Sequence, residues 1–189
     1  MSSSLRLNPV NMSILEKIVT QTKIDLKKRI SERSLQSLES EWGYEKEIKS
    51  FSQAIRGKEV KFITEVKKAS PSKGIIRENF EPVTLAKIYE DSGASAISVL
   101  TDEPFFKGHL SYMNDIAKQS NIPILRKDFI IDPYQIAEAK AYGADAILLI
   151  VRILSNAQLD ELLSVAKELH LDALVECYDT IDQERIDYE

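Results

Sequence analysis

The chain has 189 residues, 43% hydrophobic and 29% charged, which is typical of a soluble globular protein and excludes a disordered one. Its formal net charge of −5 argues against a nucleic-acid partner, because phosphate neutralisation requires a surplus of lysine and arginine on one face. One cysteine, Cys177, excludes an internal disulfide, the apolar runs are too short to span a bilayer, and two isolated histidines give no metal-ligand spacing. We therefore expect a cytoplasmic protein with no metal and no membrane or nucleic-acid partner.

The first part of the chain reads as a helical extension. Residues 13–30 place apolar side chains near helical spacing after Ser13, a favourable N-cap residue. Residues 33–56 are mostly polar with scattered apolar side chains, and they predict a second helical or irregular segment. We assign residues 1–58 to an N-terminal helical extension and residues 59–189 to a second domain.

From residue 61 onward, short apolar runs alternate with helical patterns. The runs predict strands at residues 61–67, 96–100, 122–127, 146–151 and 173–177. By subtraction, their starts are 35, 26, 24 and 27 residues apart, which is close to the length of one strand–loop–helix–loop unit. Such regular alternation predicts a parallel sheet that is covered by helices.

The ends of the intervening helices are well marked. Residues 132–135 offer an aspartate N-cap, a proline at the first helical position and a capping glutamine, and residues 155–158 open the next helix similarly. Gly143 suits the left-handed position that follows a helix. The similar segments Gly93–Ile97 and Gly143–Ile147 indicate two equivalent helix-to-strand junctions, and therefore repeated units.

Two architectures fit five parallel strands, and charge at a strand end separates them. In the first strand, Ile63, Glu65 and Lys67 share one face. In an open doubly wound sheet these charges would lie beneath covering helices at a high desolvation cost, whereas at the rim of a barrel they can face a wet cavity. The sequence therefore favours the (β/α)8 barrel family, with about the first five βα units present.

The same face counting applies to two further strands. Lys127 shares a face with Leu125, and Glu176 shares a face with Leu174. We predict that Glu65, Lys67, Lys127 and Glu176 converge on one pocket, with unrelated solvated charges on the three strands as the alternative. Two lysines and two glutamates suit acid–base chemistry, which requires no cofactor.

Several ordered segments resemble the indole-3-glycerol phosphate synthase family. The most specific are the Glu-x-Lys-x-x-Ser-Pro-Ser string at residues 65–72 and the Lys-Asp-Phe string at residues 127–129. Residues 14–18 resemble the extra helix that precedes the barrel in this family. The remaining matching segments are Ser98–Asp102, Phe105–Gly108, Ala146–Ile150 and Leu174–Glu176.

The resemblance implies an activity. The expected reaction closes 1-(2-carboxyphenylamino)-1-deoxyribulose 5-phosphate to indole-3-glycerol phosphate, with loss of CO2 and water, in tryptophan biosynthesis. It implies that Lys127 is the general acid, that Lys67 holds the anthranilate carboxylate, that Glu176 is the general base and that Glu65 is a supporting carboxylate.

The resemblance also implies a binding site for a phosphorylated small molecule. Phe106, Phe129 and Leu148 match its apolar wall, and Ser70 lies where the first loop of the family contributes to binding. For Phe106 and Leu148, ordinary core packing is an equal alternative.

The length of the chain adds a further expectation. Eight units of about 25 residues and about 60 residues of extension predict a length near 260, and by resemblance the phosphate-binding loops would follow Glu189. We therefore expect a chain truncated within its fifth helix, which can self-associate through unpaired sheet edges. The alternatives are a non-catalytic half-barrel and another phosphate-sugar barrel enzyme, such as an aldolase that forms a Schiff base.

Overall fold

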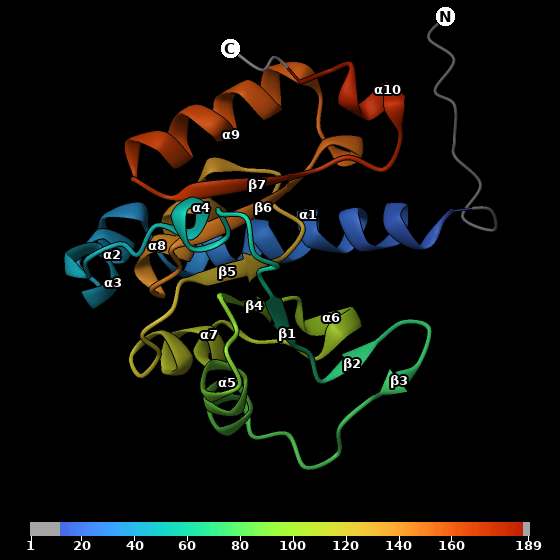
Figure 1. Ribbon diagram of the computed structural model, residues 1–189. Helices are drawn as coiled ribbons and strands as arrows, with labels where there is room; N and C mark the ends of the chain where they lie inside the picture. The colour runs from blue at the N-terminus through green and yellow to red at the C-terminus, as the bar shows by residue number, and fades with distance from the viewer. Residues whose placement is uncertain (1–11, 187–189) are drawn as a thin grey trace, which may run out of the picture.

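The computed structural model describes residues 12–186 (Figure 1). Residues 1–11 of the first predicted domain and residues 187–189 of the second lie outside this range. The division of the chain into two domains at residue 58 stays a prediction. In the structure, Phe51 of the N-terminal extension packs against residues of the sheet. Within the described part, the extension contains α1 (Ile14–Glu32), α2 (Leu35–Glu39), α3 (Trp42–Glu45) and α4 (Phe51–Ala54).

Within residues 12–186, the central sheet has five parallel strands. They are β1 (Ile63–Val66), β4 (Ala96–Leu100), β5 (Ile124–Lys127), β6 (Ala146–Ile150) and β7 (Asp172–Glu176). All five overlap the predicted runs. Their order in the sheet is β1-β4-β5-β6-β7, so each strand lies beside the previous parallel strand along the chain. A doubly wound sheet reverses its order at a switch point, whereas consecutive order is the arrangement of a barrel.

The sheet has one helix-covered face (Figure 1). Between successive strands the chain forms α5 (Pro82–Asp91), α7 (Leu110–Ala117), α8 (Pro133–Ala141) and α9 (Asn156–Glu168). Alternate strand residues such as Val66, Val99 and Leu149 are buried in the core between sheet and helices. Because successive side chains point to opposite faces, the remaining side chains of each strand lie on the other face of the sheet, which we call the inner face.

The inner face differs between its two ends. At the amino end, Phe51 of α4 packs against Ala96, Leu125 and Ala146, the first or second residues of their strands. The backbone N–H of Ser52 also donates to Asp172 Oδ2 at 2.8 Å. The extension thus closes the amino end of the inner face with apolar contacts, which leaves the carboxyl end for polar groups.

The predicted helix starts are largely confirmed. Ser13 caps α1 and Ser155 caps α9, each within a capping box. Asp132 caps α8 by accepting from the N–H of Tyr134. Gln135 was predicted to complete this cap, and this prediction was wrong. Its Oε1 accepts from the N–H of Ile131 instead, because its Nε2 also donates to the Phe129 carbonyl.

A small hairpin was not predicted. The strands β2 (Ala69–Ser70) and β3 (Gly74–Ile75) form a small antiparallel hairpin beyond β1, where β2 contacts α6 (Glu103–Phe106) (Figure 1). The two remaining elements are the 3₁₀ turn η2 (Val151–Ile153) and α10 (Thr180–Gln183). Among residues 12–186, no helix is both long enough and apolar enough to cross a membrane.

We expect Gly143→Ala to destabilise the protein more than Gly93→Ala. Both glycines have positive φ, at +80° and +90°, which costs an L residue about 1–2 kcal/mol. A Cβ at Gly143 would also lie 2.9 Å from the Trp42 ring, whereas at Gly93 it would meet nothing within 4 Å. Urea unfolding should show that Gly143→Ala lowers the free energy of unfolding by at least about 1 kcal/mol more than Gly93→Ala, which is the usual cost of overpacking. Equal losses would contradict the predicted clash.

Candidate active site

A cavity of about 180 Å³ lies at the carboxyl ends of the parallel strands. It collects side chains from β1, β4, β5 and β6 and from the loops that follow them. Charged and aromatic groups therefore face one space, as expected for the catalytic end of a barrel. The lining residues are Glu65, Lys67, Leu100, Phe106, Lys127, Asp128, Phe129 and Ile150.

Four charges at this end form two ion pairs. Lys67 Nζ contacts the Glu65 carboxylate two residues earlier on the same face of the first strand. Lys127 Nζ lies 3.5 Å from Glu176 Oε2, across the intervening strand β6. The side chain of Lys127 is 29% exposed and that of Glu176 is 50% exposed. These groups are thus held by protein contacts and remain open to solvent and to a ligand.

Two phenylalanines supply an apolar wall. The ring centroids of Phe106 and Phe129 are 6.0 Å apart, with an interplanar angle of 34°. Phe106 is the last residue of α6, whose end is fixed by Lys107 at φ 54°. Gly108 follows without room for a side chain, since a Cβ there would lie 2.3 Å from the Leu100 carbonyl oxygen. Local backbone geometry therefore aims Phe106 at the cavity.

Asp102 holds the start of the same short helix. Its Oδ1 accepts from the N–H groups of Phe105 and Phe106, at 2.8 and 3.1 Å. Burial raises the pKa of Asp102 to about 6, and neighbouring Asp128 adds to the rise while the two N–H groups oppose it. A carboxyl group that titrates near neutrality thus lies directly behind the aromatic wall.

The predicted site residues have different placements. Glu65, Lys67, Lys127, Phe106 and Phe129 line the cavity, and Glu176 reaches it through Lys127. Two others lie outside its lining. Ser70 is in the hairpin, where its hydroxyl lies near Ser72 and accepts from the N–H of Lys73, and Leu148 is only 2% exposed, two residues before Ile150.

Sequence reasoning missed three lining residues, Leu100, Asp128 and Ile150. Leu100 and Ile150 end the second and fourth strands, and counting alternate residues from Ala96 and Ala146 would have placed them on the inner face. Asp128 follows Lys127 directly, and its carboxylate bonds to Thr101 and Arg126, so alternation along β5 alone would not place it at the cavity. Within residues 12–186, no group of three or more histidine, cysteine, aspartate or glutamate side chains could hold a metal ion.

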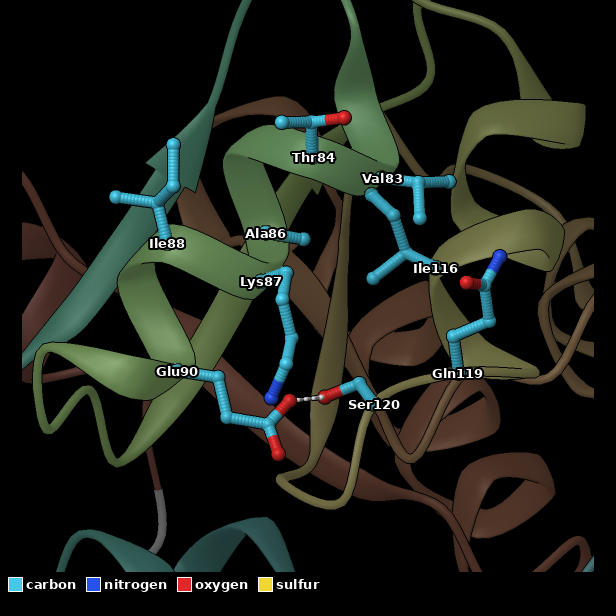
Figure 2. A pocket seen from close by; sticks show the side chains of 9 residues that line it. All are labelled: Val83, Thr84, Ala86, Lys87, Ile88, Glu90, Ile116, Gln119 and Ser120. Carbon is cyan, nitrogen blue, oxygen red and sulfur yellow. Dashed lines mark hydrogen bonds between the residues drawn. The ribbon is translucent and has the colours of Figure 1, made fainter.

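A larger cavity, of about 440 Å³, lies elsewhere, between α5 and the end of α7 (Figure 2). Its wall includes Val83, Ile88 and Ile116. Glu90 there accepts a hydrogen bond from the Ser120 hydroxyl at 2.9 Å, which Figure 2 shows. This groove has paired polar groups and a mainly aliphatic wall, so the smaller cavity with four converging charges is the better candidate.

Comparison with known proteins gives one consistent family. Residues 15–187 match the family model described as indole-3-glycerol phosphate synthase. A protein of that name from Campylobacter curvus is 49% identical over 173 residues, which cover 89% of this chain and 66% of the relative. The protein of that name from Campylobacter jejuni strain RM1221 is 50% identical over 173 residues, covering 89% of this chain and 67% of the relative.

A third relative of the same name, from Rhodopirellula baltica, is 56% identical over 121 residues, covering 64% of this chain and 47% of the relative. The chain thus spans about two thirds of the length of the Campylobacter relatives. The family match extends through the strands that carry the cavity. This chain belongs to the indole-3-glycerol phosphate synthase family.

Proposed function

We propose that the protein containing this chain converts 1-(2-carboxyphenylamino)-1-deoxyribulose 5-phosphate to indole-3-glycerol phosphate in tryptophan biosynthesis. The observation that carries the proposal is the cavity in which Lys127, Lys67 and Glu65 face two phenylalanines. In the reaction, a ring carbon bonds to the ribulose carbonyl carbon, and CO2 and water then leave. The substrate therefore needs a proton donor, a carboxylate partner and an aromatic wall, and the cavity offers each.

Lys127 is the general acid of the proposed ring closure. When the carbonyl carbon accepts the new bond, its oxygen gains an electron pair and needs a proton. The Lys127 ammonium can supply that proton and stabilise the developing negative charge. Glu176, at 3.5 Å, holds the ammonium toward the cavity.

Lys67 binds the carboxylate that later leaves as CO2. Its ammonium projects from the end of β1 into the cavity that also holds Lys127. The ion pair with Glu65 fixes the direction of its flexible side chain. Glu65 is therefore the supporting carboxylate of the site.

Glu176 is the general base of the final dehydration. Loss of the hydroxyl group as water has to be matched by removal of a proton from the ring system, and a half-exposed carboxylate beside Lys127 is suited to accept it. Acid and base are adjacent, so a proton can pass between them over the catalytic cycle.

The phenylalanines bind the aromatic part of the substrate. An apolar cavity of about 150 Å³ can hold a benzene ring, so the cavity of about 180 Å³ has room for the anthranilate ring. The phosphorylated part then extends outward past the hairpin that bears Ser70. We assign Leu148 a supporting place beneath the ring. We place the reaction in the cytoplasm, whose reducing conditions suit the exposed free thiol of Cys177.

We expect Lys127→Met to lower turnover by about 10²–10⁴-fold, the range for a general acid. Lys127→Arg should fail similarly, because guanidinium does not release a proton near neutral pH. Exposed Lys167 on α9 provides the control substitution Lys167→Met. Turnover should be measured in the 189-residue chain and in a chimera that adds the part of the Campylobacter curvus relative not spanned by this chain. Half of the parent turnover in Lys127→Met would exclude the proposed role.

We expect Asp102 to make stability depend on pH. The pKa of Asp102 in the folded protein, about 6, exceeds the ordinary value of 3.8. The stability that its protonated carboxyl group contributes is therefore fully present below pH 3.8 and is lost as pH rises through 6. Asp102→Asn keeps the cap and cannot ionise. Relative to the parent, its free energy of unfolding should therefore rise between pH 4 and pH 7, by up to about 3 kcal/mol.

Urea unfolding at several pH values measures this difference. Asp102→Ala should show the same pH dependence with an offset of about 1 kcal/mol, because alanine loses the cap. A constant difference between parent and Asp102→Asn across the range would show that Asp102 does not titrate there.

A second candidate property is self-association of the 189-residue chain. In the described part, β1 and β7 are the edges of the sheet, and large apolar side chains are exposed beside them, including Val60 at 79%, Phe62 at 62% and Tyr178 at 79%. Such edges and patches favour association. Light scattering should give a mass above 21.4 kDa that falls for Phe62→Lys. A monomer across micromolar concentrations would contradict this.

A further inference from the structure

Four buried or partly buried charges lie behind the candidate active site, on the outer side of the sheet. Arg126 is fully buried, although it precedes Lys127 directly in β5. The opposite charges balance, with two arginines and two carboxylates. We call this group the buried charge cluster; it consists of Arg29, Arg126, Asp128 and Glu138.

Arg126 is the centre of the cluster. Its Nε donates to Thr101 Oγ1 at 3.2 Å and its Nη1 to the Gln135 carbonyl at 2.7 Å. Its Nη2 lies 2.9 Å from both Asp128 Oδ2 and Glu138 Oε2. Burial alone would lower the pKa of Arg126, but the two carboxylates raise it above its ordinary value. The guanidinium therefore stays charged and fully engaged.

The same groups hold the backbone that carries Lys127. The N–H of Thr101 donates to the Lys127 carbonyl at 3.1 Å, and the Thr101 hydroxyl donates to Asp128 Oδ2 at 2.6 Å. Asp128 Oδ1 accepts from the N–H of Phe129 at 2.8 Å, and Gln135 Nε2 donates to the Phe129 carbonyl at 3.1 Å. The segment that presents both Lys127 and Phe129 to the cavity is thus fixed from behind.

The N-terminal helix completes the cluster. Arg29 of α1 donates from Nη1 to Glu138 Oε2 at 2.5 Å, and that oxygen also faces Arg126. Without Arg29, Arg126 would be the only cationic partner of Glu138 among residues 12–186. Because one nitrogen of Arg126 serves both Glu138 and Asp128, stronger pairing with Glu138 would weaken the hold on Asp128.

We propose that Arg126 is a positioning residue for Lys127 and Phe129. Arg29 of α1, through its ion pair with Glu138, sets how Arg126 divides its own pairing between Glu138 and Asp128. The inference rests on the proposed function, since it assigns these residues to the geometry of the same site. It adds a role for the N-terminal extension: α1 controls where the acid and the aromatic wall lie.

Two substitutions at the carboxyl end of α1, one in its last turn and one at its C-cap residue, form a pair for the test. Arg29→Met removes the ion pair with Glu138, and Arg33→Met removes an ion pair between Arg33 and Glu41 outside the cluster. The two arginine side chains are matched in exposure, at 28% and 27%, whereas their partners differ, with Glu138 4% exposed and Glu41 42% exposed. The double variant Arg29→Met/Glu138→Gln restores charge balance around Arg126.

We expect Arg29→Met to lower kcat of the chimera at least fivefold with KM within twofold, and Arg33→Met to leave both unchanged. The double variant should recover kcat to within twofold of the parent. A merely stabilising role would lower the melting temperature of both single variants without changing kcat well below melting.

Hydrogen exchange tests the positioning without any turnover. The Phe129 amide should exchange at least fivefold faster in Arg29→Met, relative to the Leu149 amide in the core of β6, and be unchanged in Arg33→Met. If no variant and no parent turns over, the proposed function fails while this exchange result still decides the inference. Equal behaviour of Arg29→Met and Arg33→Met in exchange would overturn it.

Discussion

The structure depends on one constraint, the two-residue alternation of side chains along β5. Neighbouring residues Arg126 and Lys127 are sent to opposite sides of the sheet. Arg126 goes into the layer between sheet and helices, where it is fully buried and has four hydrogen-bonding or ionic partners. Lys127 goes into the cavity. A single strand therefore supplies both the buried arginine and the lysine of the cavity, and their separation follows from backbone geometry alone.

The two ends of the inner face differ in their access to water. At the amino end, Phe51 from the extension packs against small and apolar strand residues, and water has no access to Leu125. Charge placed there would have to be desolvated without partners. At the carboxyl end the side chains remain 29–50% exposed and paired, which lowers that cost. The apolar closure at one end thus complements the wet cavity at the other.

The sequence was sufficient for the strands and for the inward-facing charges, because both follow from local period-two patterns and turn chemistry. Face counting brought Glu65 and Lys127 together although they lie 62 positions apart by subtraction. It could not find the partners of Arg126, because the Arg29–Glu138 contact joins positions 109 apart and depends on how α1 packs across α8. The hairpin that carries Ser70 was missed since its strands have only two residues each, too few for a periodic signal.

A buried group of four charges is a poor source of net stability, because desolvation offsets much of the attraction. Its role here is to fix the position of the backbone at the end of β5. Apolar side chains of equal volume could fill the space between β5 and α8, but they could not hold the N–H of Phe129 and the hydroxyl of Thr101 as Asp128 does. A general acid acts over distances of about 3 Å, so small displacements of the strand end change its reach. The cluster therefore exchanges stability for a defined position of the backbone, and it does so at the one strand end where the proposed chemistry requires that position.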